Sequence, residues 1–411
     1  MAIDNKDKKV LKSSIEREQN EPACSAEREK IKGSKNLNVP PLRFPEFTEE
    51  WQEHKLCNIA SIVGRIGFRG YTTNDIVAKG KGAIALSPTN IENNRLTYDK
   101  DNTYISFYKY EESPEIMIKQ GDVVFVKTGS TVGKVAYVDK LMCKTTLNPQ
   151  VIVLKNIQCD NYLLSVLMST SRFQNAIRKI TVGGAVPTLS QAAMGDIAVT
   201  MPQVAEQEKL SKFISLLDKR IATQNKIIDK LQSLIKGIAQ NVAHNNKPNI
   251  SLSECLECSS STLQESDVCE NGTYPVYGAN GIVGYLDNYN TEKEAVYIIK
   301  DGSGVGAVSY VTGKCSATGT LNTLQAKEGH SLQYLYYILK VFNFEPYKTG
   351  MAIPHIYFKD YGKAKIFCPP YQEQLRYAKM LSAIDDKLLA EQNVLTNLSL
   401  QKQYLLRQMF I

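Results

Sequence analysis

Two stretches of the chain carry the same pattern: residues 126–135 read VKTGSTVGKV and residues 299–308 read IKDGSGVGAV. In each, an apolar residue and Lys precede Gly-Ser, and Val-Gly follows one residue later. The start-to-start offset is 173 residues, from 126 to 299. Because similarity at a fixed offset is the mark of a duplicated architecture, the sequence predicts a chain that is built twice.

Further landmarks repeat at a slightly shorter offset. Residues 202–207 and 369–374 both read Pro-x-x-x-Glu-Gln, 167 residues apart. Residues 183–187 read GGAVP and residues 350–354 read GMAIP, at the same offset of 167. The change from 173 to 167 indicates that the second copy lacks six residues between the landmarks.

Two long helices are predicted, one closing each copy. Mostly apolar residues recur at alternating spacings of four and three from Leu210 to Val242 and from Tyr377 to Met409, which is typical of the seam of a coiled coil. The predicted pairing residues are Leu217, Ile221, Gln224, Ile228 and Leu231 in the first seam, and Ile384, Leu388, Glu391, Leu395 and Leu398 in the second.

Each seam of about 33 residues would span ~50 Å at ~1.5 Å per residue. The polar residues Gln224 and Glu391 stand at the same seam position, where a polar side chain tends to fix register. We expect the two helices to pair as an antiparallel coiled coil that relates the halves by a pseudo-twofold axis. The alternative is that each helix packs on a globular core of its own.

The segments before the helices contain short β-type runs and one helical stretch each, which predicts α+β domains. The expected order is a disordered or fraying tail at 1–38, a first domain at 39–203 and a long helix at 204–246. A second domain at 247–370 and a second long helix at 371–411 follow. The tail prediction rests on many Lys and Glu residues and few large apolar ones.

Composition restricts the class of protein. Hydrophobic residues make up 43% and charged residues 22%, which is ordinary for a globular protein. No apolar run approaches the ~18 residues of a membrane span, and the polar N-terminus is not a signal peptide. The net charge of +7 fits a DNA-binding surface but is a weak signal.

Nine cysteines without pairing logic suggest a reducing, cytoplasmic location. Cys255 and Cys258 form a Cys-x-x-Cys, but only Cys269 lies near them in the sequence, and the four histidines have no metal-like spacing. We therefore expect no metal site and two half-buried thiols.

Several strings resemble the DNA-specificity subunit of type I restriction-modification systems. Residues 41–47 (PLRFPEF), running on to Trp51, look like that family's entry into its first target-recognition domain. Residues 274–285 (YPVYGANGIVGY) are similar to a frequent string in its recognition domains, and the Pro-x-x-x-Glu-Gln helix starts match as well. The first half has no clear copy of the YPVYGAN string, and residues 63–71 (VGRIGFRGY) occupy the region instead.

The resemblance implies a subunit without catalytic residues or a cofactor of its own. Each domain would read one half of a bipartite site in double-stranded DNA, and the paired helices would hold the domains at a set separation. Two methyltransferase subunits would dock on the chain, and motor-nuclease subunits would join them. S-adenosylmethionine, ATP and Mg²⁺ would belong to those partners.

The residues predicted to contact DNA fall into three groups. Glycine loops let backbone N–H groups approach a phosphate, Asn can bond adenine, and Arg can bond guanine. The candidates are Lys127, Gly129, Ser130, Thr131 and Lys134 in the first loop, Lys300, Gly302, Ser303 and Gly304 in the second, then Tyr277, Asn280 and Tyr285, and finally Arg65 and Arg69. The alternatives are a hairpin turn for the loops, a left-handed Asn at 280, and solvated surface arginines.

Two other functions compete with this interpretation. One is an autonomous N6-adenine DNA methyltransferase, because residues 368–371 (CPPY) come close to that enzyme's Asp/Asn/Ser-Pro-Pro-Tyr motif. Cys is a weak acceptor for an adenine amino group, however. The other is a coiled-coil scaffold that binds no DNA.

A nucleotide-binding loop is not predicted. Residues 129–135 are one residue short of a Walker A loop and lack its Ser or Thr.

Overall fold

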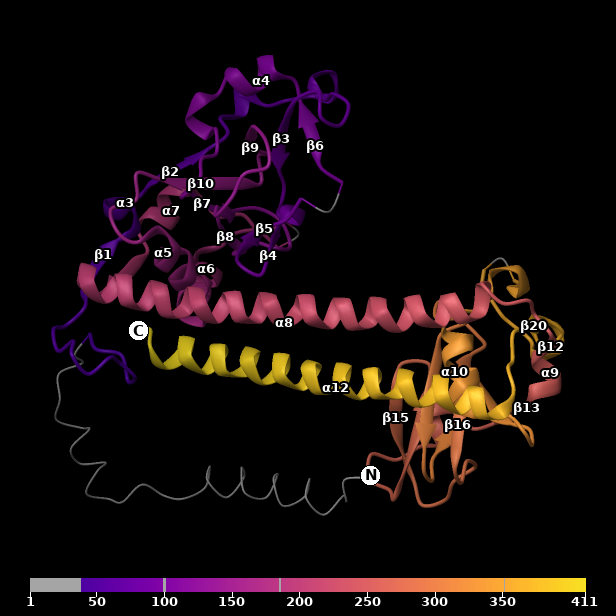
Figure 1. Ribbon diagram of the computed structural model, residues 1–411. Helices are drawn as coiled ribbons and strands as arrows, with labels where there is room; N and C mark the ends of the chain where they lie inside the picture. The colour runs from indigo at the N-terminus through magenta and orange to yellow at the C-terminus, as the bar shows by residue number, and fades with distance from the viewer. Residues whose placement is uncertain (1–37, 99–100, 185, 351) are drawn as a thin grey trace, which may run out of the picture. The chain divides into compact units, whose positions relative to one another are not determined.

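The computed structural model describes residues 38–98, 101–184, 186–350 and 352–411 (Figure 1). The tail predicted at 1–38 therefore lies outside the described residues except for Asn38. The described chain forms two compact units. Unit 1 comprises residues 38–217 and 400–411, and unit 2 comprises residues 218–399, so that each unit holds parts of both long helices.

Unit 1 is a mixed α/β unit whose strands are short. The strands are β1 (Gln52–Lys55), β2 (Ser61–Gly64), β3 (Ala83–Leu86), β4 (Ile91–Glu92), β5 (Arg95–Leu96), β6 (Thr103–Ile105), β7 (Val123–Val126), β8 (Val135–Tyr137), β9 (Thr145–Leu147), β10 (Val151–Lys155) and β11 (Ala198–Met201). The helices are α3 (Leu56–Ile59), α4 (Phe107–Glu111), α5 (Asn161–Ser169), α6 (Ser171–Ile180) and α7 (Gln191–Gly195), followed by the long α8 (Val204–His244).

Unit 2 repeats this arrangement with fewer elements. Its strands are β12 (Ile250–Ser251), β13 (Leu256–Ser260), β14 (Tyr274–Gly278), β15 (Gly281–Leu286), β16 (Glu294–Ile299), β17 (Val308–Thr312), β18 (Ser316–Ala317), β19 (Leu321–Ala326) and β20 (Lys365–Ile366). Its helices are α9 (Leu252–Cys255), α10 (Leu332–Val341), α11 (Phe358–Tyr361) and the long α12 (Tyr371–Gln408).

The sheets of the two units follow one plan. The order β2-β10-β7-β8 in unit 1 corresponds to β13-β19-β16-β17 in unit 2. A parallel pair, β3 with β9 and β14 with β18, forms part of a second sheet in each. A two-stranded antiparallel ladder completes both, β1 with β11 and β12 with β20. The duplication read from the sequence is thus a duplication of topology.

This topology corrects the placement of one string. The YPVYG segment is β14, and its counterpart in unit 1 is β3, since each pairs in parallel with a strand that follows it in the chain. Residues 63–71, expected in that place, instead begin inside β2, which corresponds to β13. β3 and β14 share a position in the fold but little sequence, so the counterpart of β14 could not be found by comparing residues.

The central strands are buried on both faces. Along β7, Val123 and Phe125 lie in one apolar cluster, whereas Val124 and Val126 lie in another. Along β16, the residues alternate in the same way between two clusters. Because successive strand residues point to opposite faces, each such sheet is covered on both sides and its strands read as continuous apolar runs.

The long helices occupy the segments that the heptads predict. Every seam position from Leu210 to Val242 and from Tyr377 to Met409 is buried or half-buried, and most positions between them are exposed. Within unit 2, the Gln224 Nε2 donates to the backbone carbonyl of Glu391 at 3.0 Å and also to its carboxylate. The Glu391 carboxylate accepts from Lys387 at 2.5 Å as well.

Apolar contacts accompany this polar pair in unit 2. Ile235 and Ala239 of α8 share a cluster with Leu381 of α12 and with Tyr337 of α10. The Tyr337 hydroxyl donates to Asp385 of α12 at 2.7 Å. In unit 1, the start of α8 and the end of the chain lie in one core, which includes Leu210, Ile214, Met409 and Phe410.

A buried glutamine joins each long helix to its domain. The Gln207 side chain accepts from the backbone N–H of Asp160 at 2.9 Å and donates to the Pro202 carbonyl at 2.8 Å. The Gln374 side chain accepts from Ser331 at 2.8 Å and donates to Pro369 at 2.8 Å. Asp160 and Ser331 are the N-caps of α5 and α10. The repeated Pro-x-x-x-Glu-Gln string therefore encodes a domain-to-helix joint.

In unit 1, the glutamate of the Pro-x-x-x-Glu-Gln string, Glu206, also binds the entry segment of the domain. Glu206 is 1% exposed and accepts from Arg43 Nε and Nη2 at 2.8 and 2.6 Å. The Trp51 indole N–H donates to the same carboxylate at 3.2 Å. This contact explains why the entry string at 41–47 and Trp51 accompany the helix start.

Among the described residues, no helix is both long and apolar enough to cross a membrane.

Replacement of Gln374 by Met tests the joint. The substitution leaves the Ser331 N–H and the Pro369 carbonyl buried without partners, so it should cost about 1–3 kcal/mol. Gln372→Met, two residues away on an exposed position of the same helix turn, is the control and should stay within about 0.5 kcal/mol. Urea unfolding of the two variants measures the difference. Equal midpoints would show that the buried amide does not stabilise the joint.

Candidate nucleic-acid interface

The first glycine loop is a tight connection between β7 and β8. The Gly133 N–H donates to the Val126 carbonyl at 3.0 Å, and the Val132 N–H donates to Gly129 at 3.1 Å. The Gly129 N–H donates to Pro187 at 2.9 Å, which ties the loop to the segment after α6. Both glycines have positive φ, +103° and +98°, a conformation that favours Gly over any residue with a Cβ.

The second loop repeats these bonds between β16 and β17. The Gly306 N–H donates to Ile299 at 2.9 Å, and the Val305 N–H donates to Gly302 at 3.2 Å. The Gly302 N–H donates to Pro354 at 3.0 Å. Gly302 and Gly306 have φ of +92° and +91°. The two loops are thus one structure built twice, down to the individual hydrogen bonds.

These hydrogen bonds leave few backbone N–H groups of the loops free to bind a phosphate. The glycines are explained by the alternative given above, a tight turn between two strands. At the tips, Ser130, Ser303 and Gly304 are exposed, Thr131 is half-buried, and Lys134 is exposed at the end of its loop. The part of the chain that the structure describes supplies no ion-pair partner for Lys127, Lys134 or Lys300. The lysines and the tip residues remain the predicted DNA contacts.

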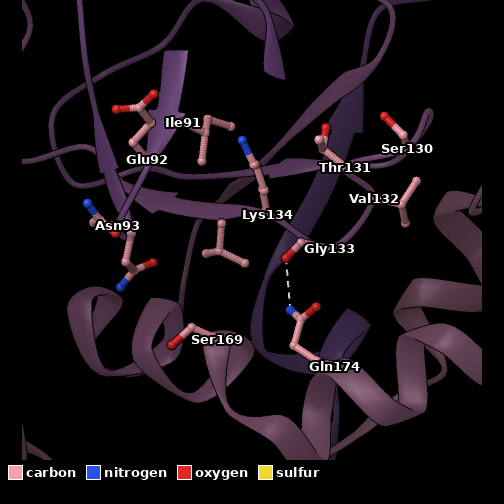
Figure 2. A pocket seen from close by; sticks show the side chains of 12 residues that line it. Ile91, Glu92, Asn93, Ser130, Thr131, Val132, Gly133, Lys134, Ser169 and Gln174 are labelled. Atoms are coloured by element: carbon pink, nitrogen blue, oxygen red, sulfur yellow. Dashed lines mark hydrogen bonds between the residues drawn. The ribbon is translucent and has the colours of Figure 1, made fainter. Parts of the chain in front are cut away.

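A cavity of about 620 Å³ opens beside the first loop (Figure 2). Its lining includes the 91–94 turn, the 130–135 loop, Ser169 and Gln174. Gln174 braces the loop, since its Nε2 donates to the Gly133 carbonyl at 2.8 Å and to the Met168 carbonyl at 2.7 Å. The loop is therefore held from both sides, by Gln174 and by the Pro187 segment.

Apolar side chains stand exposed next to both loops, and the sequence reasoning did not select them. Val182 is 75% exposed and Val186 58%, in the segment that bonds to the first loop. Ile353 is 56% exposed in the corresponding segment of unit 2. The repeated GGAVP and GMAIP strings could have pointed to these exposed residues, because both place an apolar residue directly before Pro in a loop.

The β14–β15 hairpin separates the three residues predicted from it. Tyr277 packs on Tyr297 with ring centroids 5.7 Å apart, and burial raises the pKa of its hydroxyl. Asn280 is exposed in the two-residue turn, and Tyr285 is 36% exposed on β15. Gly281, directly after the turn, has the positive φ and Asn280 does not, so the alternative of a left-handed Asn280 is wrong. Asn280 and Tyr285 face solvent, whereas Tyr277 belongs mostly to the core.

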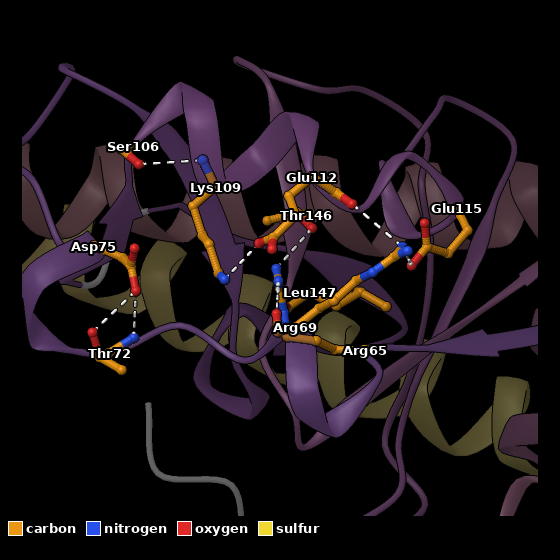
Figure 3. A network of polar contacts seen from close by, with 10 residues as sticks. All are labelled: Arg65, Arg69, Thr72, Asp75, Ser106, Lys109, Glu112, Glu115, Thr146 and Leu147. Carbon is orange, nitrogen blue, oxygen red and sulfur yellow. Dashed lines mark hydrogen bonds and ion pairs between the residues drawn. The ribbon is translucent and has the colours of Figure 1, made fainter.

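Arg65 is not available to DNA in this structure, which corrects its prediction as a contact and as a surface residue. It is 7% exposed and donates to the Leu147 carbonyl at 2.9 Å, to Thr146 Oγ1 at 3.2 Å and to the Arg69 carbonyl at 3.1 Å (Figure 3). Its guanidinium also lies 5.4 Å from the Tyr71 ring. Burial lowers the pKa of the Arg65 guanidinium.

Arg69 occupies the edge of the same network. Its Nη1 lies 3.5 Å from the Glu115 carboxylate and 3.4 Å from the Glu112 carbonyl. The side chain is 37% exposed, so it is neither buried like Arg65 nor free of partners. Arg65 and Arg69 together fasten the segment after β2 onto β9 and the 112–115 turn (Figure 3).

A lysine lies over aromatic rings at the same place in both units. Lys144, just before β9, lies 5.0 Å from the Phe107 ring centroid and 5.5 Å from that of Tyr110. It also approaches Glu111, at 3.6 Å, and is 55% exposed. Phe107 and Lys144 line a cavity of about 470 Å³ on the β6-β3-β9 sheet.

In unit 2, Lys314 stands just before β18. It lies 4.6 Å from the Tyr289 ring centroid and 5.9 Å from that of Tyr274. Its hydrogen bond to Tyr289 raises the pKa of the Lys314 ammonium, which keeps the charge in place. Each lysine is exposed and lies beside one exposed ring, Phe107 or Tyr289, an arrangement that suits the backbone and bases of a nucleic acid. No motif pointed to these lysines, because their ring partners are distant in the sequence.

Comparisons with known proteins agree with this duplicated layout. The family model described as "Type I restriction modification DNA specificity domain" matches residues 48–233 and again residues 249–398. The chain therefore belongs to the type I restriction-modification DNA specificity family.

Individual relatives are distant. A type I restriction enzyme specificity subunit of Haemophilus influenzae is 29% identical over 123 residues, and the match spans only 32% of that relative and 29% of this chain. The MjaX specificity subunit of Methanocaldococcus jannaschii is 22% identical over 401 residues, covering 86% of this chain and 91% of that one. A solved S subunit from M. genitalium has a TM-score of 0.62 at 17% identity, with 91% and 99% coverage, and so shares the fold.

Replacement of Gly133 by Ala tests the loop geometry. A Cβ there would meet Gln174 Oε1 at 2.3 Å, and an L-residue at a φ of +98° is strained by roughly 1–2 kcal/mol. We expect a lower unfolding midpoint in urea. Gly237→Ala, at an exposed position toward the C-terminal end of α8, should shift stability the other way by roughly 0.5–1 kcal/mol. A neutral Gly133→Ala would contradict the described loop.

Proposed function

We propose that this chain is the DNA-specificity subunit of a type I restriction-modification complex and that each unit reads one half of a bipartite DNA site. The observation that carries the proposal is the repetition of the glycine loop with the same hydrogen bonds in both units. The repeated lysine–aromatic cluster supports it. A protein that reads two half-sites needs two readers of one design, and the chain supplies them.

The division of labour between contacts follows from their chemistry. Lys144, Lys314 and the loop lysines contact phosphates, which fixes the position of each unit on the duplex without reading sequence. Asn280 at the tip of the β14–β15 hairpin, which bonds base edges, is the strongest candidate for direct readout in unit 2. The exposed Val182, Val186 and Ile353 suit apolar contact, for example with a thymine methyl group.

The long helices act as the spacer in this proposal. We propose that α8 and α12 form an antiparallel coiled coil that relates the two units by a pseudo-twofold axis. The Gln224–Glu391 pair, the shared cluster around Ile235 and Leu381, and the packing of the chain end beside the start of α8 support it. A seam of ~50 Å suits two readers on one face of B-DNA, where major grooves recur every ~34–36 Å.

The chemistry belongs to the partners in this proposal. Two methyltransferase subunits dock on the helices and use S-adenosylmethionine, and motor-nuclease subunits use ATP with Mg²⁺. The cytoplasm, where the DNA is, is the proposed location. The family membership of the chain is the support for these partners.

The methyltransferase-like string at 368–371 has a structural explanation. Cys368 is 8% exposed, and its backbone N–H and carbonyl both bond to the Asn249 side chain at 2.8 Å. Pro369 accepts from Gln374 in the domain-to-helix joint. A residue that presents an acceptor to a flipped adenine must face an open pocket, which disfavours an autonomous methyltransferase here.

Lys144→Ala and Lys314→Ala test the proposed DNA contacts. Each variant, bound to its methyltransferase subunits, should bind site-containing DNA several-fold more weakly, and the slope of log K against log salt should fall by about one per lysine. The half-site sequences should not change, because phosphate contacts carry no sequence information. Titrations at several salt concentrations measure this.

Lys363→Ala is the control, an exposed lysine beside β20, and it should leave the slope unchanged. An unchanged slope in both Lys144→Ala and Lys314→Ala would refute these contacts. The absence of DNA binding by the wild-type complex would favour the scaffold function instead.

A further inference from the structure

Three side chains with metal-binding chemistry converge in unit 2. Cys255 Sγ, Cys368 Sγ and a ring nitrogen of His330 all lie within 4.8 Å of one another. Cys255 ends α9, His330 precedes the N-cap of α10, and Cys368 lies between β20 and α12. Both cysteines are buried, and His330 is half-buried. Three separate elements thus bring soft ligands to one point at the start of the long helix.

The His330 ring has a backbone partner on one of its two nitrogens. Its Nδ1 lies 3.2 Å from the Glu328 carbonyl, a distance at which an Nδ1–H donates. That tautomer leaves the lone pair of Nε2 for a cation. A second bond from the other ring nitrogen to a carbonyl is the usual support of a metal-bound histidine.

The positions of Cys255, Cys368 and His330 have counterparts in unit 1 that do not form such a cluster of ligands. Ile59 ends α3 as Cys255 ends α9, and Met201 precedes Pro202 as Cys368 precedes Pro369. Cys159 precedes the N-cap Asp160 as His330 precedes Ser331. All three unit 1 residues belong to or pack on the apolar core. The joint is therefore stable with apolar side chains, and the Cys-Cys-His set is not required by the topology.

We propose that Cys255, Cys368 and His330 bind one thiolate-preferring divalent cation, Zn²⁺, with a fourth position left to water. Zn²⁺ takes Cys sulfur at ~2.3 Å and His nitrogen at ~2.0–2.1 Å in tetrahedral sites. Tetrahedral ligands at ~2.3 Å stand ~3.8 Å apart, so the observed group needs only a small contraction. Binding releases two thiol protons to solvent as both sulfurs become thiolates.

The site would stiffen the joint between domain and helix in unit 2. Cys368 lies three residues before α12, whereas Cys255 and His330 belong to the domain. The cation would add a cross-link beside the Gln374 joint, in the place where unit 1 uses Ile59 and Met201. This role does not depend on DNA binding.

The Cys-x-x-Cys spacing was a misleading signal for this site. Cys258 lies on β13, its thiol directed at the Ser259 carbonyl at 3.8 Å. Cys269 is exposed and pairs by its backbone with Tyr285. The described residues that form the cluster are distant in the sequence, so no short motif reveals them.

The test loads Zn²⁺ alone onto full-length chain prepared free of metal and under reductant. We expect one Zn²⁺ per chain by native mass spectrometry, and a thiolate-to-metal charge-transfer band when Co²⁺ replaces it. The double variant Cys255→Ile/Cys368→Met, which carries the residues of unit 1, should lose both signals. Cys258→Ser is the matched control and should keep both.

Stability provides the second readout. Zn²⁺ should raise the melting temperature of the wild type and of Cys258→Ser, but not that of the double variant. If the double variant does not fold, His330→Gln serves in its place and should weaken Zn²⁺ binding at least tenfold. Substoichiometric Zn²⁺ in the wild type, full retention in the folded variant, or a Cys255–Cys368 disulfide in the reduced preparation would overturn the proposal.

Discussion

The buried glutamine at the start of each long helix is the contact on which the rest of the architecture depends. Gln207 and Gln374 each close two backbone groups, one from a domain helix N-cap and one from the proline that precedes the long helix. A buried amide that loses its partners costs about 1–3 kcal/mol, so the joint has a strong preference for one geometry. The direction of each helix relative to its own domain is fixed there. The proposed spacer role requires this, since flexible joints would leave the distance between two readers undefined.

A polar pair in the helix seam complements this joint. Gln224 and Glu391 replace two apolar seam residues, which sacrifices some stability. In return, the Nε2 of Gln224 donates to both the carbonyl and the carboxylate of Glu391, and Lys387 forms an ion pair with the same carboxylate. The hydrogen bonds from Lys387 and Gln224 lower the pKa of the Glu391 carboxyl. Register is thereby specified in a seam of otherwise similar aliphatic residues.

The sequence predicted what depends on local periodicity and on duplication. The long helices, the repeated loops and the family follow from spacing and strings that can be counted, and the family and the helices are confirmed. The placement of β3 opposite β14 did not follow, because strands of the same topological role need share only burial and pairing. The DNA contact residues and domain boundaries remain predictions.

Single residues failed where their partners are far away in the chain. Arg65 looks like a surface arginine among glycines, but its acceptors lie on β9. Lys144 and Lys314 look like ordinary lysines until the fold brings rings beneath them. The sequence spacing grouped Cys255 with Cys258, whereas in the structure Cys255 lies close to Cys368 and His330. Long-range contacts of this kind have no signature in a short window of sequence.

We propose that a helical spacer holds two DNA readers apart, and a change of spacer length tests this proposal. Deleting residues 217–223 from α8 and 392–398 from α12 removes one heptad from each seam, on the same side of the Gln224–Glu391 pair. Methylome sequencing of a strain that carries the variant with its methyltransferase should show the unspecific gap shortened by about three base pairs, with both half-sites intact. Insertion of a heptad at the same points should lengthen it equally. Methylation with an unchanged gap, or with altered half-site sequences, would show that the helices do not set the distance between the readers.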